Sequence, residues 1–141
     1  MRKVVLISCV RKKLRTRARA KDLYASPLFQ LCYEYAKMLR PDAIFILSAK
    51  YGLVRPEQYI APYDVTLNSM SPHEIREWAS RVVCRLRQWC DLAQDHFILL
   101  AGRKYRKPLI PHLDSYEVPM EGLSIGKQLQ YLGRQLYERA V

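Results

Sequence analysis

The sequence predicts an α/β fold: a single domain over residues 1–141, with a small, mainly parallel, four-stranded sheet between layers of helices. Short continuous apolar runs, which are typical of strands buried on both faces, occur at residues 4–7, 43–47 and 97–101. The segments between these runs carry apolar residues at helical spacing. Buried strands that alternate with helices favour a parallel sheet, because each parallel pair needs a crossover connection, usually a helix.

The first strand, residues 4–7, is followed by a basic loop and then by a helix that we expect to begin at Ser26. Serine is a favourable N-cap, and Pro27 suits the first helical position, where its missing N–H would have no partner in any case. We expect the helix to run to about Arg40, because Pro41 cannot continue it.

The second strand, residues 43–47, leads into a long loop over residues 48–70. A loop of this length in a small domain is usually functional. Ser71 and Glu74 have the spacing of a capping box, which predicts a helix with an apolar face that extends to Trp89.

The third strand, residues 97–101, precedes a short helix or loop over residues 102–112 and a short fourth strand at residues 116–118. Ser124 is expected to cap a last helix, in which apolar residues recur between 125 and 136.

The charge of the chain is strongly positive and unevenly distributed. There are 24 Lys and Arg residues against 13 Asp and Glu, a formal net charge of +11. Residues 1–21 hold nine of the basic residues and no acidic one. This basic block indicates a polyanionic partner, and we expect nucleic acid, with DNA favoured over RNA. The alternative is a solvated loop that only aids solubility.

Other patterns exclude several classes of protein. No apolar run approaches the roughly 18 residues that a membrane span needs, and the run at residues 4–7 is too short for a signal peptide. We therefore expect a cytoplasmic protein without membrane contact. The four cysteines have no Cys-x-x-Cys spacing, with Cys84 and Cys90 expected on one helix, so we predict structural or buried thiols without disulfides, no metal and no cofactor.

Ligands of parallel sheets bind beyond the carboxyl ends of the strands, and this rule selects the candidate site. The loops that follow the four predicted strands are residues 8–13, 48–53, 102–105 and 121–126. We expect these loops to meet at one edge of the sheet.

Basic side chains in these loops suit phosphate groups. They are Lys12, Lys13, Lys50, Arg103 and Lys104. Gly122 lies near the start of the last helix, where free backbone N–H groups can cradle an anion, although a glycine there also suits a simple turn.

Tyrosines in and beside these loops offer faces on which bases could stack. They are Tyr51, Tyr59, Tyr63 and Tyr105. We expect at least one of the four to serve packing instead. The candidate binding set is completed by Ser8, Gly52, Asn68, Gly102 and Glu121.

Three residues are candidates for catalysis. The Asp64 carboxylate could stabilise a sugar cation or align a water, or else cap a turn. Cys9 follows Ser8 amid positive charge, which favours a thiolate nucleophile, although a small buried residue is common at a strand end. Lys50 could bind phosphate, or attack the sugar in a lyase reaction. Glu121 is a second acid that could share acid and base roles.

Several segments together resemble a widespread family of short uncharacterised bacterial, archaeal and phage proteins. The segments are 7–9, 12–13, 24–29, 47–53, 62–64 and 67–68, continued by Ala101-Gly102, Tyr105, Pro119, Glu121-Gly122, Gly126 and Leu129. Their order is also similar to the core domain of archaeosine synthase, which is compared with the uracil-DNA glycosylase fold.

This resemblance implies a uracil-DNA glycosylase-like sheet and a function with modified bases, in base modification, repair or phage defence. The chain lacks the Gly-Gln-Asp-Pro-Tyr and His-Pro-Ser-Pro segments of uracil-DNA glycosylases, so the catalytic residues of those enzymes have no counterpart here.

Three functions remain open from the sequence. The first is an enzyme that extrudes a nucleobase from a strand and cleaves its N-glycosidic bond. The second is a nucleic-acid-binding module without catalysis, and the third is an enzyme for a free nucleotide or modified base.

Overall fold

The computed structural model describes residues 1–8 and 13–140. Its main feature is a five-stranded sheet in the order β4-β3-β1-β6-β7. The strands are β1 (Lys3–Ser8), β3 (Ala43–Ser48), β4 (Gly52–Val54), β6 (His96–Leu100) and β7 (Ser115–Glu117). β1 pairs in parallel with β3 and β6, and β7 continues the parallel set beside β6.

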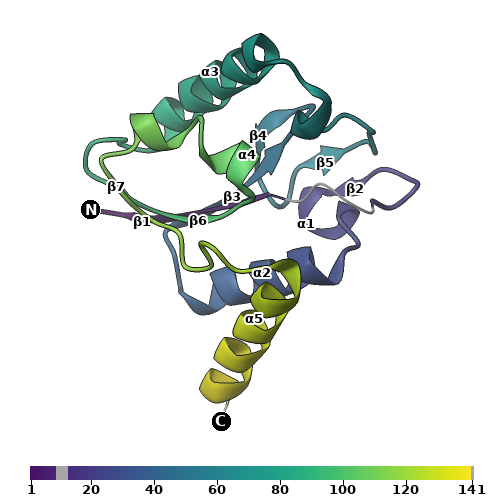
Figure 1. The fold of residues 1–141 in the computed structure, drawn as a ribbon, viewed down its shortest axis with the longest axis vertical. Coiled ribbons are helices and arrows are strands. Elements are labelled where there is room, and N and C mark those ends of the chain that lie inside the picture. Colours follow the sequence, from purple (N-terminus) through teal and green to yellow (C-terminus); the bar gives the residue numbers. More distant parts are fainter. Residues whose placement is uncertain (9–12, 141) are drawn as a thin grey trace.

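The sheet is buried at its centre because its middle strands are apolar along their length. Residues 4–7 of β1 are fully buried, and residues 97–100 of β6 are at most 3% exposed. Helices cover both faces of the sheet (Figure 1). α2 (Pro27–Met38) and α5 (Ile125–Ala140) lie on one face, and α3 (Pro72–Trp89) and α4 (Arg103–Arg106) lie on the other.

The predicted helix starts are confirmed. The Ser26 hydroxyl accepts a hydrogen bond from the Phe29 N–H at 3.1 Å. Ser71 and Glu74 form the reciprocal capping box at the start of α3. The Ser124 hydroxyl accepts from the Lys127 N–H at 3.3 Å, at the start of α5.

The prediction of four strands is wrong, because the segment 48–70 is not a plain loop. At its start, β4 folds back antiparallel to β3 through a turn that holds Gly52 at φ 76°. Further along, β5 (Tyr59–Ile60) pairs with β2 (Ala18–Arg19) in a separate two-stranded ribbon. The short 3₁₀ helix η1 (Leu67–Ser69) follows.

Other boundaries differ by one or two residues. α2 ends at Met38, and Arg40 takes a positive φ of 50° before the chain enters β3. β7 begins one residue earlier than predicted, and Cys90 lies just beyond the last residue of α3 instead of on it. The segment 102–112 contains α4 and a second 3₁₀ helix, η2 (Ile110–His112), and α1 (Ala20–Leu23) follows β2. Among the described residues, no helix combines the length and the apolar character needed to cross a membrane.

Candidate functional site

The order of the parallel strands creates a switch point between β1 and β6. The chain leaves β1 for α2 and β3 on one side, whereas it leaves β6 for β7 on the other side. In sheets of this type, ligands bind in the crevice beyond the carboxyl ends of the strands at such a point.

A cavity of about 400 Å³ lies at this switch point. Its volume falls within the usual range for small-molecule sites. The wall residues come from the ends of β1 and β6, from the segment before α5, and from the first turns of α2, α4 and α5. They are Ser8, Ser26, Pro27, Leu28, Phe29, Cys32, Leu99, Leu100, Ala101, Gly102, Tyr105, Arg106, Val118, Met120, Ile125, Gln128 and Leu129.

The polar groups of the wall are few and held in place. The Ser8 hydroxyl accepts a hydrogen bond from the Gly102 N–H at 3.1 Å, which ties the end of β1 to the end of β6. The Arg106 guanidinium donates to the Ala101 carbonyl at 2.9 Å. The Gln128 side-chain amide donates to the Leu123 carbonyl at 2.9 Å. Apolar walls with a few oriented polar groups are typical of sites for small organic ligands.

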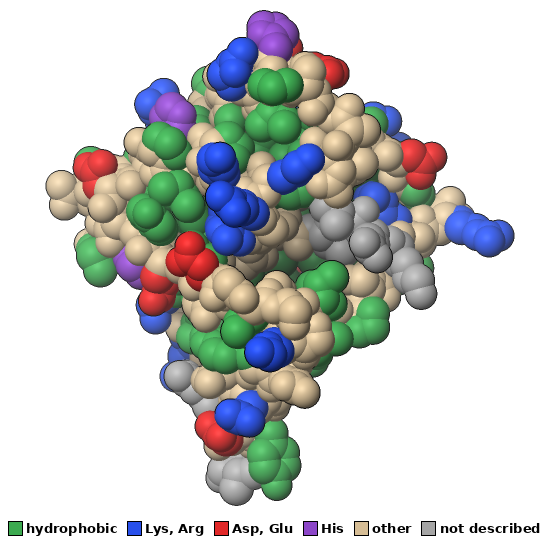
Figure 2. Space-filling view, in the orientation of Figure 1, with side chains coloured by type: hydrophobic (Ala, Val, Ile, Leu, Met, Phe, Trp, Pro, Cys, Tyr) green, Lys and Arg blue, Asp and Glu red, His purple; other side chains and the backbone are tan. Residues whose placement is uncertain are grey.

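Positive charge gathers beside this cavity. α4 and the residue after it carry Arg103, Lys104, Arg106 and Lys107. Figure 2 shows Lys and Arg side chains gathered over the position of α4, near the middle of the face in view. Arg103 and Lys104 are exposed, and no carboxylate of the described residues lies within 4.0 Å of either cation. Both side chains are therefore accessible to a phosphate group, and their role in phosphate binding stays a prediction.

A second group of predicted site residues forms an aromatic cluster beyond the end of β3. The hydroxyl groups of Tyr24 and Tyr63 lie 2.6 Å apart in a buried hydrogen bond. The Tyr51 ring packs edge-on against the Tyr63 ring, with 5.7 Å between centroids. The ammonium groups of Lys13 and Lys50 lie over these rings, 4.3 Å from the Tyr63 centroid and 5.3 Å from the Tyr51 centroid.

The aromatic cluster reaches the cavity through one contact. The Tyr24 ring packs 5.0 Å from the ring of Phe29, which lines the cavity. Tyr63 is buried by this packing, at 8% exposed, and Lys13 is half-buried. Among the three tyrosines of the cluster, Tyr51 is the half-buried one, so its ring is more accessible to a ligand than those of Tyr24 and Tyr63.

Tyr105 is the tyrosine that serves packing. It is 3% exposed, and its ring lies edge-on to the Trp78 ring at 5.6 Å. It contributes to the cavity wall but does not offer an open face for stacking. Tyr59, in contrast, is 60% exposed and has the Arg19 guanidinium 5.8 Å from its ring.

Both glycines that were candidates for binding at turns have a positive φ. Gly52 has φ 76° as the first residue of β4, directly after the turn, and Gly122 has φ 80° in the turn before α5. This conformation favours glycine for the backbone alone. Gly122 also lies three residues before the first residue of α5, so Ser124, not Gly122, occupies the helix start.

The remaining candidates are dispersed. The side chains of Asp64, Asn68 and Glu121 are exposed, and none of the three lines the cavity. Glu121 directly follows Met120, a wall residue, whereas Asp64 directly follows Tyr63 of the aromatic cluster. Cys9 and Lys12 lie outside the described residues.

The sequence reasoning missed most of the cavity wall. Phe29, Cys32, Met120 and Gln128 were not candidates, and Arg106 was not distinguished from its basic neighbours. The apolar faces of α2 and α5 were visible in the sequence. That α2 and α5 pack against each other beside β1 is a tertiary fact.

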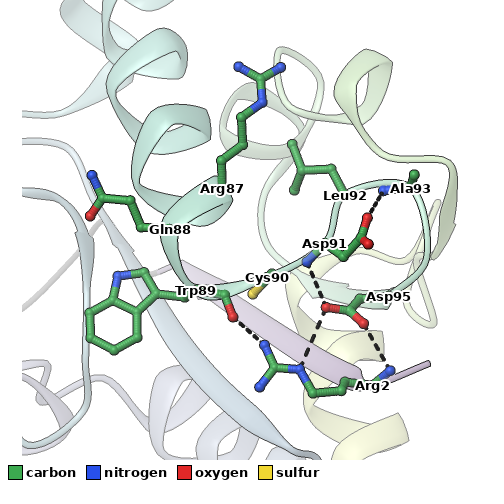
Figure 3. Close-up of a pocket in the computed structure, with 9 residues that line it drawn as sticks. All are labelled: Arg2, Arg87, Gln88, Trp89, Cys90, Asp91, Leu92, Ala93 and Asp95. Carbon is green, nitrogen blue, oxygen red and sulfur yellow. Dashed lines mark hydrogen bonds and ion pairs between the residues drawn. The ribbon is translucent and has the colours of Figure 1, made fainter.

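A larger but open hollow of about 680 Å³ lies at the opposite, amino edge of the sheet (Figure 3). Its polar groups bond to one another. The Asp95 carboxylate accepts from the backbone N–H groups of Arg2 and Asp91, each at 2.9 Å, and the Arg2 guanidinium donates to the Trp89 carbonyl. We interpret these hydrogen bonds as structural, because they connect the start of β1 to the segment after α3, and we do not interpret the hollow as a ligand site.

The fold and the cavity define a doubly wound α/β protein with a ligand-sized site at the switch point of its sheet. The chain belongs to the family of unknown function DUF6884, whose profile matches residues 4–134. It is similar to the "uncharacterized protein YfjM" of Bacillus subtilis (strain 168), with 31% identity over 150 residues that cover 99% of this chain and 98% of the relative. The resemblance to a family of uncharacterised proteins is thus confirmed, and the further likeness to the archaeosine synthase core and to uracil-DNA glycosylases stays a prediction.

Proposed function

We propose that the protein acts on nucleic acid, that it takes one extruded base into the switch-point cavity, and that it cleaves the N-glycosidic bond of that base. The observation that carries the proposal is the cavity itself, about 400 Å³ with mostly apolar walls, next to the cations of α4. A flat base can pack against Phe29 and Met120, while Ser8 and Gln128 offer polar groups to its edge. Arg103 and Lys104 supply charge for the flanking phosphates.

Glycosidic cleavage needs a carboxylate near the sugar, to stabilise its developing positive charge or to orient water. No described residue that lines the cavity is Asp or Glu, so the carboxylate has to come from outside the wall. Asp64 and Glu121 are the two acids that we propose for this role. The same observation favours a second candidate function, a module that binds an extruded base without cleaving it.

The test of catalysis is an assay of DNA and RNA that carry different modified bases, with released base and abasic sites measured by mass spectrometry. We expect Asp64→Asn to abolish release and to leave binding nearly unchanged, because the substitution removes charge but little volume. Glu121→Gln is the matched substitution at the other acid. Normal release by both variants would contradict the proposed carboxylate, and binding without release by the unaltered protein would favour the module.

The cavity is tested by Gly102→Leu. Gly102 lines the cavity, has an ordinary φ of −60°, and a Cβ added there meets no heavy atom within 4 Å. We expect this side chain to obstruct the cavity and to reduce base release, or the affinity for an extruded base, by about ten-fold or more. Gly133→Leu is the matched control, because a Cβ at this exposed position of α5 is equally unobstructed. Equal behaviour of the two variants would exclude the cavity as the site.

A further inference from the structure

The structure divides the basic residues from 13 to 21 into two groups with different surroundings. Lys13, Arg19 and Lys21 make contacts with the rest of the fold, whereas the segment 14–17 between them is exposed. Figure 1 shows this segment reaching outward, before β2, beyond the carboxyl edge of the sheet. We name residues 14–17, with the sequence Leu-Arg-Thr-Arg, the basic tip.

Backbone hydrogen bonds anchor the chain on both sides of the basic tip. On one side, Lys13 forms an antiparallel bridge with Tyr24, and the Leu14 N–H donates to the Leu23 carbonyl at 2.8 Å. On the other side, residues 18–19 pair with β5. The Ala20 N–H then donates to the Gln58 carbonyl at 2.8 Å.

One acid, Glu57, forms ion pairs with both cations that follow the basic tip. Its carboxylate pairs with the Arg19 guanidinium and the Lys21 ammonium, each at 2.9 Å. The hydrogen bond from Lys21 is the main cause of the lowered pKa of Glu57, and the same bond raises the pKa of Lys21. Arg19 and Lys21 are therefore already paired within the protein.

Arg15 and Arg17 are in a different position. Both are exposed, and no carboxylate of the described part of the chain lies within 4.0 Å of either guanidinium. Figure 2 shows a basic side chain that stands out from the surface at this edge. Two arginines without ion pairs on a loop that is fastened at both ends suit phosphate oxygens, because the guanidinium fork can bind two oxygens and the loop loses little entropy on contact.

The basic tip also lies on the same edge of the molecule as the cavity. Lys13, at the start of the tip, pairs with Tyr24. The Tyr24 ring packs against the cavity residue Phe29, and Tyr24 lies two positions before Ser26, another wall residue. A strand that presents a base to the cavity can therefore pass along this edge.

From these contacts we infer that, among the basic residues from 13 to 21, Arg15 and Arg17 bind the phosphate backbone of a DNA strand, while Lys13, Arg19 and Lys21 hold the basic tip in place. The inference rests on the proposed action on nucleic acid, and it identifies the basic tip as the surface that binds the phosphate backbone.

The test measures how salt changes the affinity for a short fluorescein-labelled oligonucleotide of mixed sequence, supplied as duplex DNA, as single-stranded DNA and as RNA. Each phosphate contact contributes about 0.9 to the slope of log affinity against log salt for duplex DNA. We therefore expect Arg15→Ala with Arg17→Ala to lower that slope by about 2 and to weaken binding about ten-fold. The pair Arg15→Lys and Arg17→Lys keeps both charges and should retain most of the slope.

The matched control is Arg81→Ala with Arg85→Ala, which removes two exposed arginines from α3. An equal fall in slope for both pairs would overturn the inference, because it would show a response to net charge only. An unchanged slope in the tip variant would overturn the inference but not the proposed function, which the base-release assay tests separately. Tighter binding of RNA than of DNA would overturn the choice of DNA, and failure of the unaltered protein to bind any of the three would overturn both proposals.

Discussion

Replacement of Trp78 by alanine is expected to lower the free energy of unfolding by about 3–5 kcal/mol. Trp78 is a fully buried residue of α3. Its ring packs against Tyr105, and its Nε1–H donates to the Ser48 carbonyl at 2.8 Å. The substitution leaves a cavity and also leaves that buried carbonyl without its donor. Urea denaturation measures the loss.

The second tryptophan of the chain offers a matched control. Trp89 lies at the end of the same helix but is 45% exposed, so Trp89→Ala should cost much less. Trp78→Phe separates packing from hydrogen bonding, because it keeps most of the ring and removes the donor. Equal losses for Trp78→Ala and Trp89→Ala would show that burial at Trp78 is not what stabilises α3 on the sheet.

Trp78→Phe also has an expected effect at the site. The Ser48 hydroxyl accepts a hydrogen bond from the Tyr51 N–H at 2.9 Å, so Ser48 shapes the turn that carries Lys50 and Tyr51. Loss of the Trp78 donor is expected to loosen Ser48 and, with it, the accessible ring of the aromatic cluster. The core on the α3 face and the candidate site are thus connected through one residue.

Asp95→Asn is expected to destabilise the protein by about 2–3 kcal/mol at neutral pH, because hydrogen bonds to a charged group are worth more than neutral ones. Asp95 is 4% exposed and fastens the starts of β1 and β6 through the N–H groups of Arg2 and Asp91 (Figure 3). An asparagine amide can accept with one oxygen only, so its NH₂ group faces a donor.

The contribution of Asp95 should depend on pH in one direction. The hydrogen bond from the Asp91 N–H is the largest cause of the lowered pKa of Asp95, and the Arg2 N–H and guanidinium add to it, while burial opposes the shift. Because the pKa is lower in the folded protein than its ordinary 3.8, the stabilisation is present above pH 3.8 and is lost as the pH falls through the folded value.

Urea denaturation of both proteins at neutral pH and at about pH 3 measures this dependence, and the difference in stability should shrink at the lower pH. Asp42→Asn is the matched control: the Asp42 carboxylate also accepts from a strand residue, the Lys3 N–H at 2.7 Å, but it is exposed. A difference at Asp95 that does not change with pH would contradict the ionic contribution.

Local patterns were sufficient for much of the fold. The apolar runs at residues 4–7, 43–47 and 97–101 predicted the central strands, because a strand covered on both faces has no polar side to alternate. Ser26 and Ser71 predicted helix starts, because their hydroxyl groups bond to N–H groups only three residues away. The short strands β4 and β5 were missed, since two or three residues carry no periodic pattern and depend on the partner strand.

The concentration of positive charge was visible in the sequence, but which of the cations form ion pairs within the protein was not. Nine cations without an acid in residues 1–21 indicated one polyanion surface. Glu57, which lies 38 positions after Arg19 and 36 after Lys21, pairs with both of them in the fold. Among the basic residues from 13 to 21, only Arg15 and Arg17 are exposed without an ion pair to a described residue, so a contact distant in sequence decided which of these cations are available.

The sequence by itself therefore determined the class of fold, the helix starts and the edge of the sheet at which a site should lie, since these depend on hydrophobic periodicity and on bonds between near neighbours. Only the tertiary structure decided that the candidate site is a cavity between β1 and β6, walled by α2 and α5, and that Tyr63 and Tyr105 are buried while Tyr51 is partly exposed. The physical reason is that a cavity and the exposure of a ring are properties of packing between segments far apart in the chain, and no local pattern encodes which of those segments meet.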